Sequence, residues 1–133
     1  MTSRIIYPLQ RSGNLLFLRA NIRGLDNRNT RVRLLIDTGA TYTTLPLNVL
    51  DDIGYESNTI DRRIDIMTAS GKERVPMISI AAFNCLCETL TDFSVIALNL
   101  PSHPLMNGLL GMDFLSKFGT TIDIKKAQIT MER

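Results

Sequence analysis

The sequence contains few of the residues that cross-link a chain or bind a metal. It has two cysteines, Cys85 and Cys87, and one histidine, His103. On a strand the two cysteines would project from the same face, where a disulfide between them would be strained. Two thiols and one distant histidine also make a poor metal site. We therefore expect half-buried structural cysteines, a solvated loop histidine, no metal and no cofactor.

Long apolar runs are also missing. The longest uncharged stretch near the N-terminus, Ser12 to Leu18, is too short to span a bilayer and lacks a cleavage site of small residues. We expect no membrane segment in this chain. A reducing, cytoplasmic location is the default expectation for such cysteines.

Aromatic residues make up only 6% of the chain, none of them is tryptophan, and the formal net charge is +2. This composition offers little for stacking bases or neutralising phosphates, so no nucleic-acid partner is expected. Basic residues do gather early in the chain, at Arg19, Arg23, Arg28, Arg31 and Arg33. The favoured interpretation is a solvated strand face beside a turn, and the alternative is a basic patch for an acidic partner.

What is present is a succession of strands and turns. The 133 residues suit a single domain, 1–133, in which 1–14 form a possible N-terminal arm. Short helices are predicted from Pro46 to Ile53 and from Met112 toward Phe118, and a polar hairpin tip from Thr68 to Arg74. Alternating or apolar runs predict strands at 15–24, 31–36, 60–67, 75–83, 93–98, 121–124 and 128–131. The fold class is therefore all-β, with one or two short helices.

Asp37-Thr38-Gly39-Ala40 follows the apolar end of the 31–36 strand, where an unsatisfied carboxylate would be costly. Two carboxylates that share one proton can hydrolyse a peptide bond, one as base toward a water and the other as acid toward the carbonyl oxygen. The sequence holds one such loop, so the pair would need two chains related by a twofold axis. If Asp37 is half of such a pair, the enzyme is a homodimer.

The segment Leu34 to Ala40 resembles the catalytic loop of retropepsin-like (retroviral-type) aspartic proteases, in their cellular and bacterial branch. The segment Leu109 to Leu115, Leu-Leu-Gly-Met-Asp-Phe-Leu, is similar to the hydrophobic-hydrophobic-glycine motif of that family and the helix after it. Between them, Thr68 to Arg74 is a candidate flap. The resemblance covers roughly Leu15 to Met131 and implies a closed barrel of the acid-protease type. It also implies an aspartic endopeptidase that acts as a homodimer on a polypeptide.

The resemblance assigns roles to individual residues. Asp37 supplies the catalytic carboxylate, Thr38 bonds across the dimer axis, and Gly39 braces the carboxylates through its backbone N–H. The other roles are contact with an extended peptide at Ala40, Ala69, Ser70 and Gly71, and support beneath the loop at Leu110 and Gly111.

The chain departs from the retroviral pattern at several places. Thr41 stands where an acid is common, the hairpin tip has one glycine and no tyrosine, and a further hairpin follows the second motif. Subsite preference, flap closure and the dimer interface therefore stay open. The alternative function is a retropepsin-like dimerisation or peptide-binding module with weak or no proteolytic activity. Asp113 is interpreted as a helix cap or an arginine partner, in preference to a second carboxylate of the site.

Overall fold

The computed structural model describes residues 3–56, 60–100 and 106–132 of the chain. His103, predicted to be a solvated loop residue, lies outside the described residues. The helices are α1 (Leu47–Asp52) and α2 (Met112–Leu115), with one 3-10 turn, η1 (Leu25–Asn27). The strands are β1 (Arg4–Pro8), β2 (Gln10–Ser12), β3 (Leu15–Arg23), β4 (Asn29–Ile36), β5 (Thr44–Leu45), β6 (Arg62–Thr68), β7 (Gly71–Cys85), β8 (Glu88–Ala97), β9 (Leu109–Leu110), β10 (Thr120–Asp123) and β11 (Gln128–Glu132).

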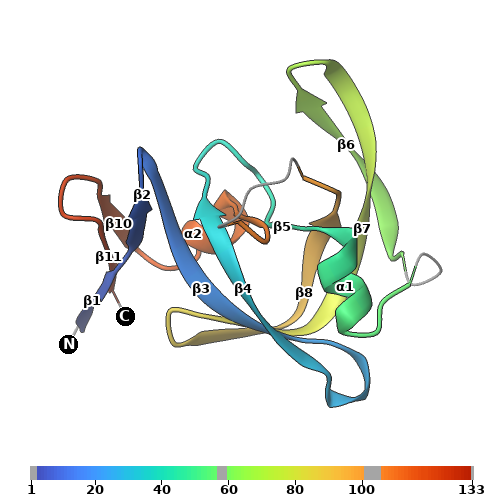
Figure 1. Ribbon diagram of the computed structural model, residues 1–133, viewed down its shortest axis with the longest axis horizontal. Coiled ribbons are helices and arrows are strands. Elements are labelled where there is room, and N and C mark those ends of the chain that lie inside the picture. The colour runs from blue at the N-terminus through green and yellow to red at the C-terminus, as the bar shows by residue number, and fades with distance from the viewer. Residues whose placement is uncertain (1–2, 57–59, 101–105, 133) are drawn as a thin grey trace.

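The larger sheet forms a ring. Its strand order is β2-β3-β4-β9-β5-β8-β7-β6, and a further pairing of β3 with β7 closes the circle. The β6–β7 hairpin rises from this ring at the upper right of Figure 1. The prediction of a mostly β fold with two short helices is confirmed. No helix within the described ranges has the length and apolar character needed to cross a membrane.

A smaller sheet joins the two ends of the described chain, in the order β1-β11-β10. Arg4 pairs with Glu132 and Pro8 with Gln128, so the termini lie close together at the left of Figure 1. The possible N-terminal arm therefore consists largely of strands, because β2 continues from β1 and pairs with the start of β3. A strand was one of the alternatives for this arm, but no bounds were predicted, since 4–12 has no clear alternation of apolar and polar residues.

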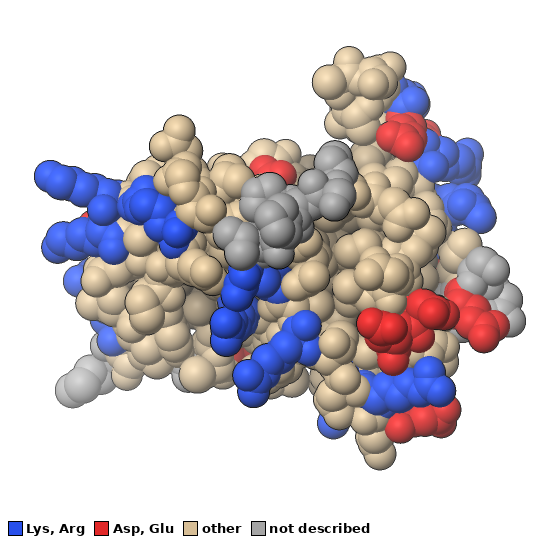
Figure 2. Space-filling view, in the orientation of Figure 1, with Lys and Arg blue, Asp and Glu red and all other residues tan. Residues whose placement is uncertain are grey.

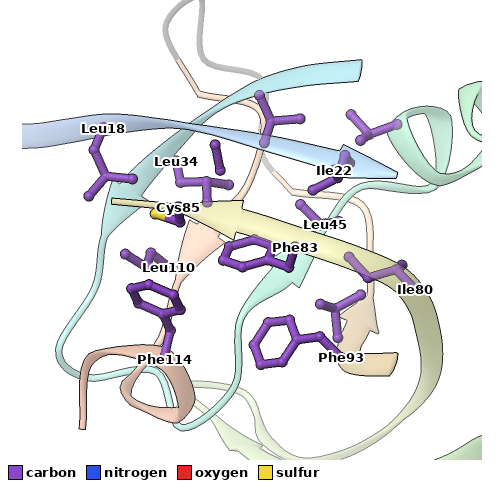
Figure 3. Close-up of a cluster of buried hydrophobic side chains, with 14 of the residues drawn as sticks. Leu18, Ile22, Leu34, Leu45, Ile80, Phe83, Cys85, Phe93, Leu110 and Phe114 are labelled. Carbon is purple, nitrogen blue, oxygen red and sulfur yellow. The ribbon is translucent and has the colours of Figure 1, made fainter. Parts of the chain in front are cut away.

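A core of aromatic and aliphatic side chains fixes the ends of the strands that lead to the candidate site. The ring of Phe83 lies 4.9 Å from that of Phe93 and 5.6 Å from that of Phe114, between centroids, as Figure 3 shows. Leu34 on β4 and Leu110 on β9 are completely buried in the same core. Burial of such side chains contributes about 1.5–3 kcal/mol each, so the segments after β4 and β9 start from fixed positions.

The β6–β7 hairpin is longer, and its turn tighter, than predicted. β6 runs to Thr68 and β7 starts at Gly71, so the turn is Ala69 and Ser70 alone rather than all of 68–74. Asp65 faces Arg74 across the two strands. Opposite charges on directly paired residues favour pairing, which is why a segment as polar as 72–74 is a strand.

Two predictions around the β7–β8 turn are also wrong in detail. β8 begins at Glu88 rather than at 93, since its polar first residues pair in register with the end of β7. Cys85 ends β7 and is buried, whereas Cys87 lies in the turn with a φ of 61° and is exposed. The two cysteines therefore do not share one face of a strand, because the chain has already turned at Leu86.

Candidate active site

Asp37 lies where β4 ends beside β9. The two strands run parallel, with Leu35 opposite Leu109 and Ile36 opposite Leu110. The backbone N–H of Asp37 then donates to the carbonyl of Leu110 over 3.0 Å. The apolar run of β4 is thus held in the core up to the residue before the carboxylate. This pairing brings the two sequence motifs together, although more than seventy positions separate Asp37 from Leu110.

The carboxylate of Asp37 is oriented by the tight turn that follows it. The N–H of Gly39 donates to Oδ1 of Asp37 over 3.0 Å, and the N–H of Ala40 donates to the carbonyl of Asp37 over 3.1 Å. A Cβ at position 39 would lie 3.3 Å from that same Oδ1. Asp37 is half-buried and Thr38 is exposed. The loop therefore presents one carboxylate, held by one backbone donor, at the surface of the described chain.

The start of α2 holds the other half of the loop. The N–H of Met112 donates to the carbonyl of Ala40 over 2.8 Å, and that of Asp113 donates to Thr41 over 3.1 Å. Backbone-to-backbone bonds of this kind fix the path of the loop without depending on side chains. Residues 37–41 are therefore tied to β9 at one end and to α2 at the other.

Gly111 lies directly against the backbone of the loop. A Cβ at this position would lie 2.6 Å from the carbonyl carbon of Tyr42 and 2.9 Å from the amide nitrogen of Thr43. No larger residue fits unless the backbone moves. Buried Leu110 precedes Gly111 on β9. The supporting role that the resemblance assigned to these two residues stays a prediction.

Asp113 does not cap α2, so the favoured interpretation of this residue is wrong. The N-cap position is Gly111. The carboxylate of Asp113 instead accepts from the N–H of Thr43 over 2.9 Å and from its hydroxyl over 2.8 Å. It also accepts from the N–H of Phe114 over 2.9 Å. Asp113 therefore fastens the far end of the loop to α2, and no periodicity in the sequence indicates a contact across seventy positions.

Burial raises the pKa of the Asp113 carboxyl above its ordinary value, although the hydrogen bonds from Thr43 and Phe114 act in the opposite direction. Thr43 is completely buried. Its hydroxyl oxygen also accepts from the N–H of Gly111 over 3.2 Å. One buried hydroxyl thus links Asp113 and Gly111, two residues of the second motif that contact the loop.

The hairpin residues predicted to contact substrate lie apart from this network. Ala69 and Ser70 are exposed at the turn, and Gly71 has a φ of 112°. Within the turn, the hydroxyl of Thr68 donates to the carbonyl of Gly71 over 3.0 Å and accepts from the N–H of Ser70 over 3.2 Å. Among the described residues, no hydrogen bond joins this tip to Asp37. The tip stands at the end of a hairpin that projects beyond the ring (Figure 1).

An apolar groove lies beside Asp37, and no pattern in the sequence indicated it. Its volume is about 420 Å³. Leu15 at the start of β3 and Ile124 after β10 line it and are 38% and 67% exposed. Its remaining walls are Asn14, Leu16, Leu35, Ile36, Asp37, Thr38 and Ile122. Exposed apolar side chains around a carboxylate are typical of a surface that a partner covers.

The residues around Asp37 do not form a metal site. Within the three described ranges, no group of three His, Cys, Asp or Glu side chains is placed to hold a metal ion.

Comparison with known proteins points to one family. The model of a family described as gag-polyprotein putative aspartyl protease matches residues 24–117. The fold is similar to that of a retropepsin-like aspartic protease from Rickettsia conorii, with a TM-score of 0.70 and 20% identity over 99% of this chain and 92% of that one. It is also similar to the retroviral protease-like domain of Ddi1 from Leishmania major, with a TM-score of 0.59 and 17% identity over 86% of this chain and 85% of that one. No match was found among curated protein sequences.

Proposed function

We propose that this chain, which belongs to the retropepsin-like aspartic protease family, is an endopeptidase whose active site forms between two copies. Each copy contributes one Asp37. One carboxylate accepts a proton from a water while the other, protonated, donates to the carbonyl oxygen of the scissile bond. The two carboxylates share one proton in this proposal. No cofactor takes part in these steps.

The observation that carries this proposal is the carboxylate of Asp37, braced by the N–H of Gly39 at the edge of an apolar groove. A single carboxylate does not supply both the base and the acid. The chain has one Asp-Thr-Gly loop. A twofold axis beside Asp37 would bring the same residue of a second copy to face it, and Thr38 would lie next to that axis.

The β6–β7 hairpin suits the role of a flap over an extended polypeptide. Its turn exposes Ala69 and Ser70, and half-buried Gly71 follows at the start of β7. Extended peptides bind through main-chain hydrogen bonds to such segments. Closure of a hairpin over substrate excludes water from the reaction. In this proposal Ala40, small and half-buried beside the carboxylate, forms the floor under the peptide.

The experiment compares wild type with Asp37→Asn in cleavage of a peptide library from about pH 4 to about pH 7, the acidic to neutral range in which carboxylate acid–base catalysis is tested. The mass in solution is recorded for both proteins. Asn keeps the shape of the side chain and loses the proton chemistry, so we expect a dimer in both cases and cleavage only by wild type. A variant that cleaves as fast as wild type would refute the role of Asp37. A stable wild-type dimer that cleaves nothing would favour the dimerisation or peptide-binding module.

A further inference from the structure

We propose that the outward face of β3 and β4 binds an acidic segment of a polypeptide partner. This basic face consists of Arg19 and Arg23 on β3 and Arg31 and Arg33 on β4. Figure 2 shows Lys and Arg side chains over the region where these two strands cross. The surface is distinct from the groove beside Asp37, and its binding does not require cleavage.

The strand register places all four arginines on one side of the sheet. Arg19 faces Arg33 directly and Asn21 faces Arg31, so that arginine and asparagine side chains form a continuous row. The residues between them point into the core and are buried, namely Ala20, Ile22, Val32 and Leu34. Since side chains alternate along a strand, the arginines share the opposite, outward face.

These positive charges have no ion-pair partner among the described residues. Like charges directly opposite each other destabilise a strand pair, so the Arg19–Arg33 pairing carries a cost in stability. The one ion pair found in the described part of the chain joins Arg4 to Glu132 in the smaller sheet. Among the described residues, Nε of Arg33 is also buried without a hydrogen-bond partner. The exposed Arg19, Arg23 and Arg31 are thus placed to take carboxylates from outside the chain, whereas the buried Nε of Arg33 is closed to them.

A shallow hollow on this face is suited to carboxylate side chains. Its volume is about 210 Å³, and Arg19, Arg31, Asn21 and Asn84 contribute to its lining. Asn84 faces Asn21 across β3 and β7 and donates to the hydroxyl of Thr89 over 2.7 Å. Arginine binds carboxylates through paired, charge-assisted hydrogen bonds. The amide of Asn21 can in turn bond the backbone of a bound peptide.

Two other anionic partners fit this surface less well. Apart from arginine itself, the residues paired with the arginines are Asn21, Asn29 and Ala82, and the neighbouring hollow adds Asn84. None is aromatic, so bases of a nucleic acid would find no ring on which to stack. A membrane surface would need apolar anchors among the charges. The exposed large apolar side chains of the described residues lie at other positions, namely Ile6, Leu15, Leu25, Leu47, Met67, Met112 and Ile124. The chemistry therefore favours an acidic peptide.

The test is fluorescence anisotropy of a labelled, glutamate-rich peptide of roughly ten residues, long enough to run along the paired strands. The full chain is compared with Arg19→Glu/Arg31→Glu and with a matched control, Lys125→Glu/Lys126→Glu. The control lysines lie between β10 and β11, outside the basic face, and the two double variants change the net charge equally. We expect wild type to bind, and to bind more weakly as salt is added. The affinity of the basic-face variant should fall about tenfold or more, and that of the control by less than about twofold.

An equal loss in both double variants would overturn the proposal, since binding would then follow net charge alone. It would also be overturned by a wild type that does not bind the peptide, or that binds single-stranded RNA or phosphatidylserine vesicles as tightly. Thermal unfolding checks that each variant is folded. Should Arg19→Glu/Arg31→Glu unfold, Arg19→Gln/Arg31→Gln replaces it. We expect this variant to lose affinity for the peptide, and unchanged affinity would contradict the proposal.

Discussion

At the scale of single residues, Gly111 shows how little space the candidate site leaves. Because a Cβ there would lie 2.6 Å from the backbone of Tyr42, Gly111→Ala should displace the loop that carries Asp37. We expect the free energy of unfolding to fall by about 1–3 kcal/mol, the usual cost of overpacking, and peptide cleavage to be lost. Denaturant unfolding and a cleavage assay measure the two effects.

The matched control is Gly119→Ala, where the nearest atom to an added Cβ is 3.7 Å away, on the side chain of Glu132. That variant should unfold like wild type. If Gly111→Ala and Gly119→Ala were equally stable, the close packing of Gly111 under the loop would be wrong.

The carboxyl of Asp113 provides a second test at this scale. Burial raises its pKa above the ordinary value of 3.8, so the folded chain keeps the proton to a higher pH than the unfolded chain. The contribution of Asp113 to stability is therefore fully present below that ordinary value and is lost as the pH rises through the raised pKa. The amide introduced by Asp113→Asn does not titrate, so the difference in unfolding free energy between wild type and this variant should shrink with rising pH. Denaturant unfolding of both proteins, from below pH 3.8 upward, measures this difference in free energy. A difference that grows with pH would contradict the burial of Asp113.

At the scale of elements, the β6–β7 hairpin carries the clearest prediction. Gly71 has a φ of 112°, a conformation that side chains with a branched Cβ strongly disfavour. Gly71→Val should therefore reshape the turn and lower kcat/KM if the tip closes over substrate. Gly13→Val is the control, because Gly13 also has a positive φ, 59°, with open space around it, in the turn between β2 and β3. A similar loss of kcat/KM in both variants would argue that backbone strain, and not the flap, is responsible.

Sequence patterns predicted the elements whose residues alternate or form apolar runs. β3 was found to within one residue and β4 to within two, because their inward and outward positions differ sharply in polarity. The polar first half of β8 and the strands of the N-terminal arm were missed, since pairing with other strands, not polarity, makes them extended: β8 with β7, β2 with β3 and β1 with β11.

The sequence pointed to those residues of the candidate site that belong to a recognisable motif, but not to the contacts between them. Asp37, Gly39 and Gly111 stand out because their spacing resembles a known family, and Gly39 does donate to Asp37. The bonds between Asp113 and Thr43 were not predictable, because they join residues seventy positions apart. The groove lined by Leu15 and Ile124 likewise exists only after β3 and the β10–β11 hairpin come together.

At the scale of the whole molecule, the proposed active site requires a second copy that covers the groove beside Asp37. The carboxylate, the exposed Leu15 and the exposed Ile124 all lie around that one groove. A dimer that buries it would cover apolar surface and bring the two Asp37 loops together in the same step. Activity should therefore depend on protein concentration if, as proposed, a protomer alone has half of the acid–base pair.

The most direct measurement mixes wild type with Asp37→Asn at constant total protein and follows peptide cleavage after subunits have exchanged. If each active site needs Asp37 from both copies, only wild-type homodimers cleave, and the rate should fall with the square of the wild-type fraction. An equal mixture would then retain about one quarter of the wild-type rate, as random pairing in a twofold dimer requires. A rate that falls in simple proportion to the wild-type fraction would mean that each copy cleaves alone, and would contradict the shared pair of carboxylates.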